Sequence, residues 1–324
     1  MRLLLCREAP AGVRCVAVDG LPRGAHLELS HWPGNRTPAR LKADTSTGIA
    51  LNLAAAKDRA DLLAGCELVI NDHLDCDGLL AAWTVFNPDD ALVHAPDLVA
   101  AAEAGDFAWF TTPAGVRLAL LLDDVLELPG AAELLGVTGG EAHSREQQAA
   151  DALLARMPGL LTDLGALAPL VQAPYDRVVD SLAAFARGEV QAHDVQRAAL
   201  SVVMSSRPLE RLAVWTWARF DRVLRARRAA DGNAYVLELT ARSWFDTPAP
   251  PRGRRVPLQP IARALQALEP ERGVRWLADP EAPSKLHSRL WSAGSDGSEA
   301  ASGLDFSMVE EVVVAALLEA EKSP

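Results

Sequence analysis

The N-terminal part of the chain shows two kinds of hydrophobic pattern. Alternating apolar positions in Val13–Ala17 and Leu27–Leu29 predict two strands, on either side of a turn at Leu21–Gly24. From Ile49 to Leu63 the apolar residues instead keep the spacing of one helix face. The short apolar run Leu68–Ile70 then predicts a buried strand.

The next segment repeats this order of elements. A polar loop, Asn71–Gly78, leads into a predicted helix at Leu79–Phe86, which Pro88 ends. Ala91–His94 predicts a third strand, and Pro96–Ala104 predicts another helix. Strands and helices that alternate at such short spacing are typical of βαβ units, so we expect a parallel sheet.

The middle of the chain, from about residue 114 to residue 205, is rich in Ala and Leu at helical spacing. Helices are predicted at Leu118–Leu128, Glu146–Met157, Leu160–Leu170, Arg177–Arg187 and Val195–Met204. The pattern therefore indicates a helical region that follows the parallel sheet.

The C-terminal part mixes both patterns. Strands are predicted at Leu212–Trp217 and Tyr235–Thr240, with a turn at Asp231–Asn233, and the chain ends with a helix at Met308–Glu321. We therefore expect the α/β class, with a parallel-sheet domain and the helical middle in residues 1–205. A smaller α+β domain that binds the substrate is expected in residues 206–324.

Composition excludes several classes of protein. The chain has 324 residues, of which 49% are hydrophobic and 23% charged, so it can bury a sizeable core. No apolar run reaches the length of a membrane span, and the apolar part of the N-terminus is too short for a signal peptide. The four cysteines lack zinc-binding spacing. We expect reduced thiols in a cytoplasmic protein without a membrane partner.

Charge is distributed unevenly along the chain. The net charge of −11 argues against a general nucleic-acid-coating protein. Residues 205–290, however, hold 16 Arg or Lys against 9 Asp or Glu, a net charge of +7, and most tryptophans lie in this segment or just beyond it. Arginines next to aromatic residues can bind a small phosphorylated or nucleotide-like ligand. The candidate substrate-binding residues are Arg252, Arg254, Arg255 and Arg275. A solvated basic face over an aromatic core is the alternative.

The loop Asn71–Gly78 has the highest density of potential metal ligands. In an extended segment, His73, Asp75 and Asp77 point to the same side. The loop also follows a predicted parallel strand, where ligands of open α/β sheets bind. Mixed carboxylate and imidazole ligands suit Mn²⁺ or Mg²⁺ better than a structural zinc ion. The alternative is a solvated loop in which Asp77 caps the following helix.

An apolar strand followed by His-x-Asp-x-Asp-Gly and a helix resembles the first motif of the DHH-superfamily phosphoesterases. The resemblance covers Leu68–Gly78. It implies a hydrolase, commonly dependent on manganese, that cleaves phosphodiester or phosphoanhydride bonds with metal-activated water. It also implies that His73, Asp75 and Asp77 bind a metal pair, with His73 and Asp77 in the catalytic centre, and that a second domain holds the substrate. The Gly-rich stretch Gly294–Gly303 is loosely similar to the family's substrate-domain motif.

The Asp-His-His motif that names this family does not occur in the chain. Asp106, Asp123 or Asp44 is therefore expected to complete the second metal position. His31 and His94 are expected to contact the substrate beside this centre. The segment Lys42–Gly48, with its hydroxyl groups before a helix, is a further candidate for phosphate binding.

Two other functions fit the same residues. A non-catalytic ligand-binding protein could retain the DHH-like fold without a complete metal pair. The segment Asp75–Leu80 is also similar to the Asp-x-Asp-Gly-Thr-Leu motif of haloacid dehalogenase-like phosphatases, in which the first Asp is a nucleophile. In that case Asp75 would form a covalent phosphoaspartate.

Overall fold

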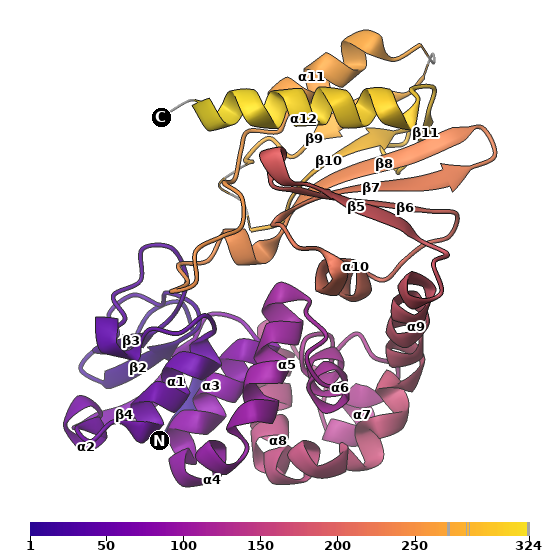
Figure 1. Ribbon diagram of the computed structural model, residues 1–324. Helices are drawn as coiled ribbons and strands as arrows, with labels where there is room; N and C mark the ends of the chain where they lie inside the picture. The colour runs from indigo at the N-terminus through magenta and orange to yellow at the C-terminus, as the bar shows by residue number, and fades with distance from the viewer. Residues whose placement is uncertain (271–272, 283, 285, 323–324) are drawn as a thin grey trace. The chain divides into compact units, whose positions relative to one another are not determined.

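The computed structural model describes residues 1–270, 273–282, 284 and 286–322 (Figure 1). The chain forms two compact units. The first contains Met1–Arg177 together with the distant segment Phe245–Ala249, and the second contains Val178–Trp244 and Pro250–Pro324. The expected boundary between residues 205 and 206 lies inside the second unit.

The first unit is built on a parallel sheet of four strands in the order β1-β4-β2-β3. The strands are β1 (Arg2–Leu5), β2 (Arg14–Val18), β3 (Leu27–Leu29) and β4 (Cys66–Asn71). From Cys15 to Val18 and from Leu68 to Asn71 every residue is buried, as expected for the inner strands of a parallel sheet. The predicted α/β class with an N-terminal parallel sheet is confirmed.

Helices account for most of the rest of this unit. They are α1 (Ser46–Ala55), α2 (Arg59–Leu62), α3 (Cys76–Phe86), α4 (Pro88–Val93), α5 (Ala95–Phe107), α6 (Pro113–Leu122), α7 (Ala131–Leu135), α8 (Ala142–Asp163) and the first part of α9 (Ala168–Ala186), with short 3₁₀ turns at Ala39–Leu41 and Gly165–Leu167. The helix α3 is the central one, because every residue from Cys76 to Val85 is buried and the helix packs against α1 and α5.

Several predicted elements of this unit are confirmed, but four differ. The helix predicted at Leu118–Leu128 ends at Leu122, and the one predicted at Leu160–Leu170 is interrupted after Asp163 by a 3₁₀ turn. The segment Ala91–His94 belongs to the helix α4 and its end, so the predicted third strand is wrong. Pro88 at the first helical turn, with Asp89 and Asp90 behind it, is a helix-start signal that outweighs the short apolar run. The helix predicted at Ile49–Leu63 already ends at Ala55.

The second unit is built on a mixed sheet of seven strands. The path runs β5-β6-β7-β8-β10-β9, and β11 pairs with β8. The strands are β5 (Gln191–Val195), β6 (Leu200–Ser205), β7 (Arg222–Ala229), β8 (Gly232–Leu239), β9 (Arg275–Ala278), β10 (Ser288–Ala293) and β11 (Ala301–Ser302). The helices are the end of α9, α10 (Arg211–Trp217), α11 (Gln259–Leu268) and α12 (Phe306–Lys322), with 3₁₀ turns at Gln196–Ala198 and Ala241–Ser243.

One face of this sheet is covered by α11 and α12 (Figure 1). The core contains Leu224 and Leu237 from the sheet, Leu265 from α11 and Leu317 from α12. Side chains of alternate strand residues point to opposite faces. The neighbours of these core residues along β7 and β8 therefore form the other face of the sheet.

Sequence patterns were misleading at two places in this unit. The helix predicted at Val195–Met204 is wrong, because most of the segment forms β6 and the end of β5. The strand predicted at Leu212–Trp217 is also wrong, since this segment forms α10. Both are short apolar runs, for which periodicity alone does not separate strand from helix. The strand at Tyr235–Leu239 and the final helix are confirmed.

Among the described residues, no single helix is both long and apolar enough to cross a membrane, although the consecutive helices α8 and α9 meet the length and composition criteria as a bent pair.

A buried arginine joins three segments of the second unit. Arg222 is fully buried, and its guanidinium donates to the carbonyl oxygens of Ala198 and Arg254. It also forms an ion pair of 2.6 Å with Glu321 near the end of α12. A buried charge needs such partners, because desolvation without them costs several kcal/mol.

We therefore expect Glu321→Gln to lower the free energy of unfolding, because the substitution leaves the buried Arg222 without its anionic partner. The expected loss is only about 1–2 kcal/mol, since the side chain of Glu321 is 40% exposed and the pair is partly screened by water. The matched control is Glu319→Gln, whose exposed pair with Lys322 should contribute less than about 0.5 kcal/mol. Urea denaturation of the full chain measures both. Equal effects of the two variants would contradict the anchoring role of Glu321.

Candidate metal centre

Acidic and imidazole side chains gather where the parallel strands of the first unit end. Asp19 directly follows β2, His31 follows β3 by two residues, and His73 follows β4 by two residues. The carboxyl ends of parallel strands lie at one edge of a sheet, so these residues meet there. The sequence predicted this edge correctly for the loop after β4.

The first group of potential ligands surrounds the imidazole of His31. It consists of Asp19, His31, Asp77 and Asp106, with one ligand atom of each within 4.8 Å of the others. The Nε2 atom of His31 lies 3.3 Å from an oxygen of Asp19, 3.3 Å from Asp106 and 3.6 Å from Asp77. Among the described residues, Nε2 of His31 and Oδ2 of Asp106 are buried without a hydrogen-bond partner.

The other ring nitrogen of His31 is already used. Its Nδ1 lies 2.6 Å from the main-chain oxygen of Asp44, to which it donates a hydrogen bond when protonated. This bond leaves Nε2 directed at the carboxylates as an electron-pair donor in the neutral imidazole. Metal-binding histidines are usually oriented by such a hydrogen bond.

A distant segment, Phe245–Ala249, holds this part of the site in place. The ring of Phe245 stacks on His31 with centroids 3.9 Å apart. The main-chain N–H of Asp246 donates to the carbonyl of His31 over 2.7 Å, and that of Ala249 donates to the carboxylate of Asp44 over 3.1 Å. The segment therefore fixes both His31 and the residue that orients it.

Asp77 lies in the first turn of α3, and its carboxylate points at the N-terminus of α1. Its carboxylate accepts hydrogen bonds from the main-chain N–H groups of Ser46 and Thr47, over 2.6 Å and 2.7 Å. These N–H groups and the helix dipole stabilise the negative charge of Asp77. The sequence predicted that the segment Lys42–Gly48, which contains these N–H groups, could bind phosphate. In the structure the carboxylate of Asp77 accepts both N–H groups instead, which corrects this prediction.

The second group of potential ligands is more exposed. It consists of Asp19, His73 and Asp75. Nε2 of His73 lies 3.1 Å from Asp19 and 3.2 Å from Asp75, while its Nδ1 lies 2.7 Å from Asp72. Asp75 also caps α3 by accepting from the N–H of Gly78, so the cap is Asp75 and not Asp77.

Asp19 belongs to both groups, although the sequence analysis did not name it. One of its oxygens faces His31 and the other faces His73. The side chains of His73, Asp75 and Asp77 do not share one side as an extended loop would require, because α3 begins at Cys76 and turns Asp77 toward His31. The sequence offered one signal that Asp19 could belong to the site: it lies just after a predicted strand and directly before Gly20.

Burial and mutual repulsion shift the pKa values of the centre. Burial, together with the carboxylates of Asp77 and Asp19, raises the pKa of Asp106 well above its usual value. Burial and the Asp19 carboxylate likewise raise the pKa of Asp75. Burial opposes ionisation of Asp19 too, but contacts with His31 and His73 lower its pKa below the usual range. Crowded carboxylates of this kind attract a cation.

Three other sequence candidates lie outside the two groups. The carboxylate of Asp123 accepts from the N–H of Cys76 at the start of α3, over 2.8 Å. The main-chain carbonyl of Asp44 is bonded to His31, whereas its carboxylate accepts from the N–H of Ala249. His94 joins α4 to α5 and does not end a strand at the sheet edge. His31, predicted to contact the substrate, is instead a potential metal ligand.

The four arginines predicted to bind an anion have separate structural positions in the second unit. The guanidinium of Arg255 donates to Thr240, Ser243 and Ser288, and burial lowers its pKa to about 10. Arg254 offers its carbonyl to Arg222. Arg252 lies in the loop before α11, and Arg275 starts the edge strand β9.

The fold and the centre define an α/β protein with a buried cluster of carboxylates and imidazoles at the edge of a parallel sheet. Residues 5–323 match the model described as "Family of unknown function (DUF6687)", and the chain belongs to that family. No curated protein and no solved structure shows a significant match to the chain.

We expect Asp106→Asn to stabilise the protein in EDTA. The substitution removes a carboxylate that faces other carboxylates at the C-terminal end of α5, where a negative charge is unfavourable. The gain in the free energy of unfolding should be about 1–3 kcal/mol. Chemical denaturation measures it. The control is Asp124→Asn on an exposed residue, expected within about 0.5 kcal/mol of wild type. A destabilised Asp106→Asn protein would contradict the repulsion argument.

Proposed function

We propose that the chain is a divalent-metal-dependent phosphoesterase whose centre is the pair of ligand groups that share Asp19. The observation that carries this proposal is the shared carboxylate between two groups, each with one imidazole. A carboxylate placed in this way can bridge two ions, and paired ions are the usual arrangement in metal-dependent phosphatases and nucleases.

The donor atoms fit hard divalent cations. The first group offers carboxylate oxygens from three residues and one imidazole nitrogen, without a thiolate. Such a set suits Mn²⁺ or Mg²⁺ better than a structural zinc ion. Within the described part of the chain, Nε2 of His31 and Oδ2 of Asp106 are buried polar atoms without a hydrogen-bond partner, which a cation would satisfy.

The residues of the chain have separate tasks in this proposal. His31 and Asp106, with Asp77, hold the buried position, and His73 and Asp75 hold the more exposed one, where a substrate has access. When bound, divalent ions lower the pKa of coordinated water and offset the charge of a phosphoester. Burial raises the pKa of Asp77, and its hydrogen bonds from the N–H groups of α1 oppose this effect and favour an anionic ligand at the buried position.

Phosphodiester or phosphoanhydride hydrolysis is the reaction that the motif His73-x-Asp75-x-Asp77 implies by resemblance. We also infer a cytoplasmic location, since all four cysteines are free thiols, the state expected in a reducing compartment. The substrate is proposed to be a small phosphorylated or nucleotide-like molecule.

The first test is metal stoichiometry. We expect wild type to bind two Mn²⁺ ions, Asp75→Asn to bind one, and Asp19→Asn to lose both, because only Asp19 belongs to both groups. Asn keeps the capping oxygen at position 75, so α3 should remain folded. Equilibrium dialysis measures the number of ions. Saturating Mn²⁺ at about 100-fold its dissociation constant should also stabilise wild type by about 2.7 kcal/mol for each ion bound.

The matched control for stoichiometry is Asp44→Asn. Its carboxylate contacts only the N–H of Ala249 among the hydrogen bonds described, and its carbonyl still orients His31. Two bound ions are expected. If Asp19→Asn binds as many ions as wild type, the shared-carboxylate centre is refuted.

The second test is turnover of a chromogenic phosphodiester with Mn²⁺. Asp77→Asn should reduce turnover by about 100-fold or more, as expected for loss of a metal ligand, and EDTA should abolish it in wild type. The Asp44→Asn control should retain turnover. Activity that survives both Asp77→Asn and EDTA would contradict the mechanism. A phosphoaspartate trapped at Asp75 would favour the dehalogenase-like alternative, and metal binding without any hydrolysis would favour a non-catalytic binding protein.

A further inference from the structure

The face of the second unit's sheet that lies opposite α11 and α12 carries arginines in its centre. Leu224 and Ala226 of β7 point into the core, so Arg225 and Arg227 point away from it. Strand register places Arg225 between Val203 and Val236, and Arg227 between Ser205 and Ala234. Each arginine is therefore flanked by two small, uncharged side chains.

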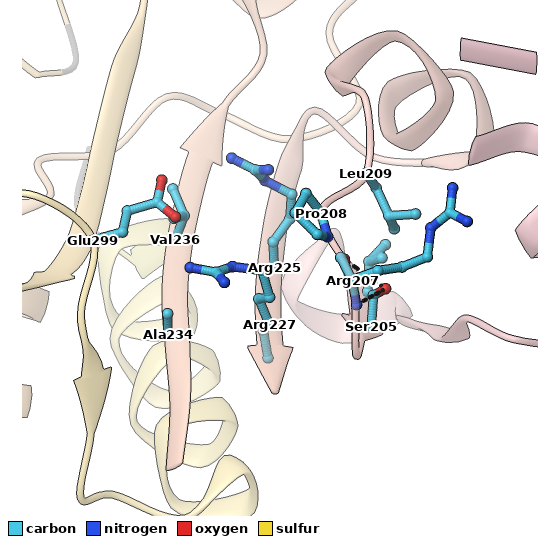
Figure 2. Close-up of a pocket in the computed structure, with 11 residues that line it drawn as sticks. Ser205, Arg207, Pro208, Leu209, Arg225, Arg227, Ala234, Val236 and Glu299 are labelled. Carbon is cyan, nitrogen blue, oxygen red and sulfur yellow. Dashed lines mark hydrogen bonds between the residues drawn. The ribbon is translucent and has the colours of Figure 1, made fainter. Parts of the chain in front are cut away.

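A hollow of about 100 Å³ lies over these two rows (Figure 2). Val203, Ala234 and Val236 form its floor, and Pro208 and Leu209 form a wall. This space holds about three waters, and so suits one small polar group.

The wall is fixed by Ser205. Its hydroxyl donates to the carbonyl of Arg207 over 2.8 Å and accepts from the N–H of Arg207 over 3.1 Å (Figure 2). The guanidinium of Arg207 forms an ion pair with Asp180, which compensates its charge. The hollow is therefore shaped before a ligand binds, and Arg207 is not its main anion-binding group.

Arg225 and Arg227 are the groups available to a ligand. The Nε of Arg225 lies 2.9 Å from a carboxylate oxygen of Glu238 in an ion pair, but the two atoms do not meet hydrogen-bond geometry, so this pair compensates the charge of Arg225 only in part. For Arg227 no ion pair or hydrogen bond occurs within the described part of the chain, and both of its cross-strand neighbours are uncharged. Glu299 also lines the hollow and adds one carboxylate.

A second, larger hollow of about 320 Å³ adjoins the first across the Arg225–Glu238 pair. Arg211, His287 and Arg289 line it, with Asp279 and Glu238 as its acidic residues. Trp215, also in its lining, is 3% exposed and has a buried indole N–H without a hydrogen-bond partner among the described residues. Five arginines and three carboxylates thus line the two hollows of an otherwise acidic chain.

We propose that this sheet face binds a small phosphorylated molecule, with its phosphoryl oxygens on Arg227 and Arg225 in the smaller hollow. Guanidinium groups match phosphoryl oxygens because they donate in a planar fork. Glu299 can accept from a hydroxyl group of the ligand, and the larger hollow offers polar groups to the rest of the molecule. The site lies wholly within the second unit and does not depend on the proposed metal centre.

The test is isothermal titration calorimetry, in which inorganic phosphate is added to the full chain in the presence of EDTA. EDTA removes ions that would otherwise bind phosphate at the first unit. Wild type should bind phosphate, and Arg227→Gln should raise the dissociation constant by about tenfold or more, the loss expected for a charge-assisted pair. Since Arg227 has no hydrogen-bond or ion-pair partner among the described residues, the Arg227→Gln variant should have the melting temperature of wild type. Arg227→Lys should recover only part of the affinity, because lysine keeps the charge without the fork.

The matched control is Arg263→Gln, which removes the same charge from an exposed position on α11, over the opposite sheet face. It should bind phosphate as wild type does. Asp19→Asn should also bind normally, which separates this site from the metal centre. Equal affinities of wild type and Arg227→Gln would overturn the proposal, as would equal losses in Arg227→Gln and Arg263→Gln. Acetate binding as tight as phosphate at the same ionic strength would refute the phosphoryl assignment.

Discussion

The first unit depends on one electrostatic constraint, the burial of several carboxylates around the imidazole of His31. Asp19 and Asp77 are fully buried and Asp106 nearly so, and each would cost several kcal/mol if it remained charged and unpaired. Burial opposes a positive charge on His31, but the contact with Asp19 and the charge of Asp77 outweigh it, so the pKa of the imidazole is raised. One imidazolium can balance only part of this charge. The remainder must be balanced by main-chain dipoles, by protons or by a bound cation.

The surrounding secondary structure supplies part of that balance, and this explains how the elements are arranged. Two N–H groups at the N-terminus of α1 donate to the carboxylate of Asp77. At the start of α3, main-chain N–H groups donate to the carboxylates of Asp75 and Asp123. Helix N-termini are the positions where a backbone stabilises negative charge. Asp106 has the opposite surroundings, because it lies in the last turn of α5. Among the described residues, neither Asp106 nor Asp19 accepts a main-chain N–H at its carboxylate, and Asp106 also lies at the unfavourable end of a helix. Asp106 is therefore the carboxylate that gains most from a cation.

Local patterns predicted the parallel sheet and the loop after β4, because both depend on periodicity within a few residues. His73, Asp75 and Asp77 could be found because they follow one another closely. Asp19 and His31 could not be assigned as reliably, since their role arises only when the ends of β2 and β3 meet the end of β4. The contribution of Phe245 was beyond local reasoning altogether, because a residue more than two hundred positions from His31 must fold back onto its ring. Errors at Ala91–His94, Val195–Met204 and Leu212–Trp217 share a different cause: short apolar runs fit a buried strand and a buried helix equally well.

The backbone of Asp19 adds an argument that is independent of charge. Its φ angle is 58°, in the left-handed region, where Asn and Asp are the most tolerant residues after glycine. The following residue, Gly20, has no room for a side chain, because a Cβ there would lie 2.2 Å from a carboxylate oxygen of Asp72. Two hydrogen bonds stabilise the turn. The N–H of Asp19 donates to the carbonyl oxygen of Leu29, and the hydroxyl of Ser30 donates to the carbonyl oxygen of Asp19. Glycine would adopt this turn with less strain than aspartate, yet the chain places a carboxylate there and directs its two oxygens at two imidazoles. Strain retained at such a position is typical of a residue that serves a binding site more than it serves stability.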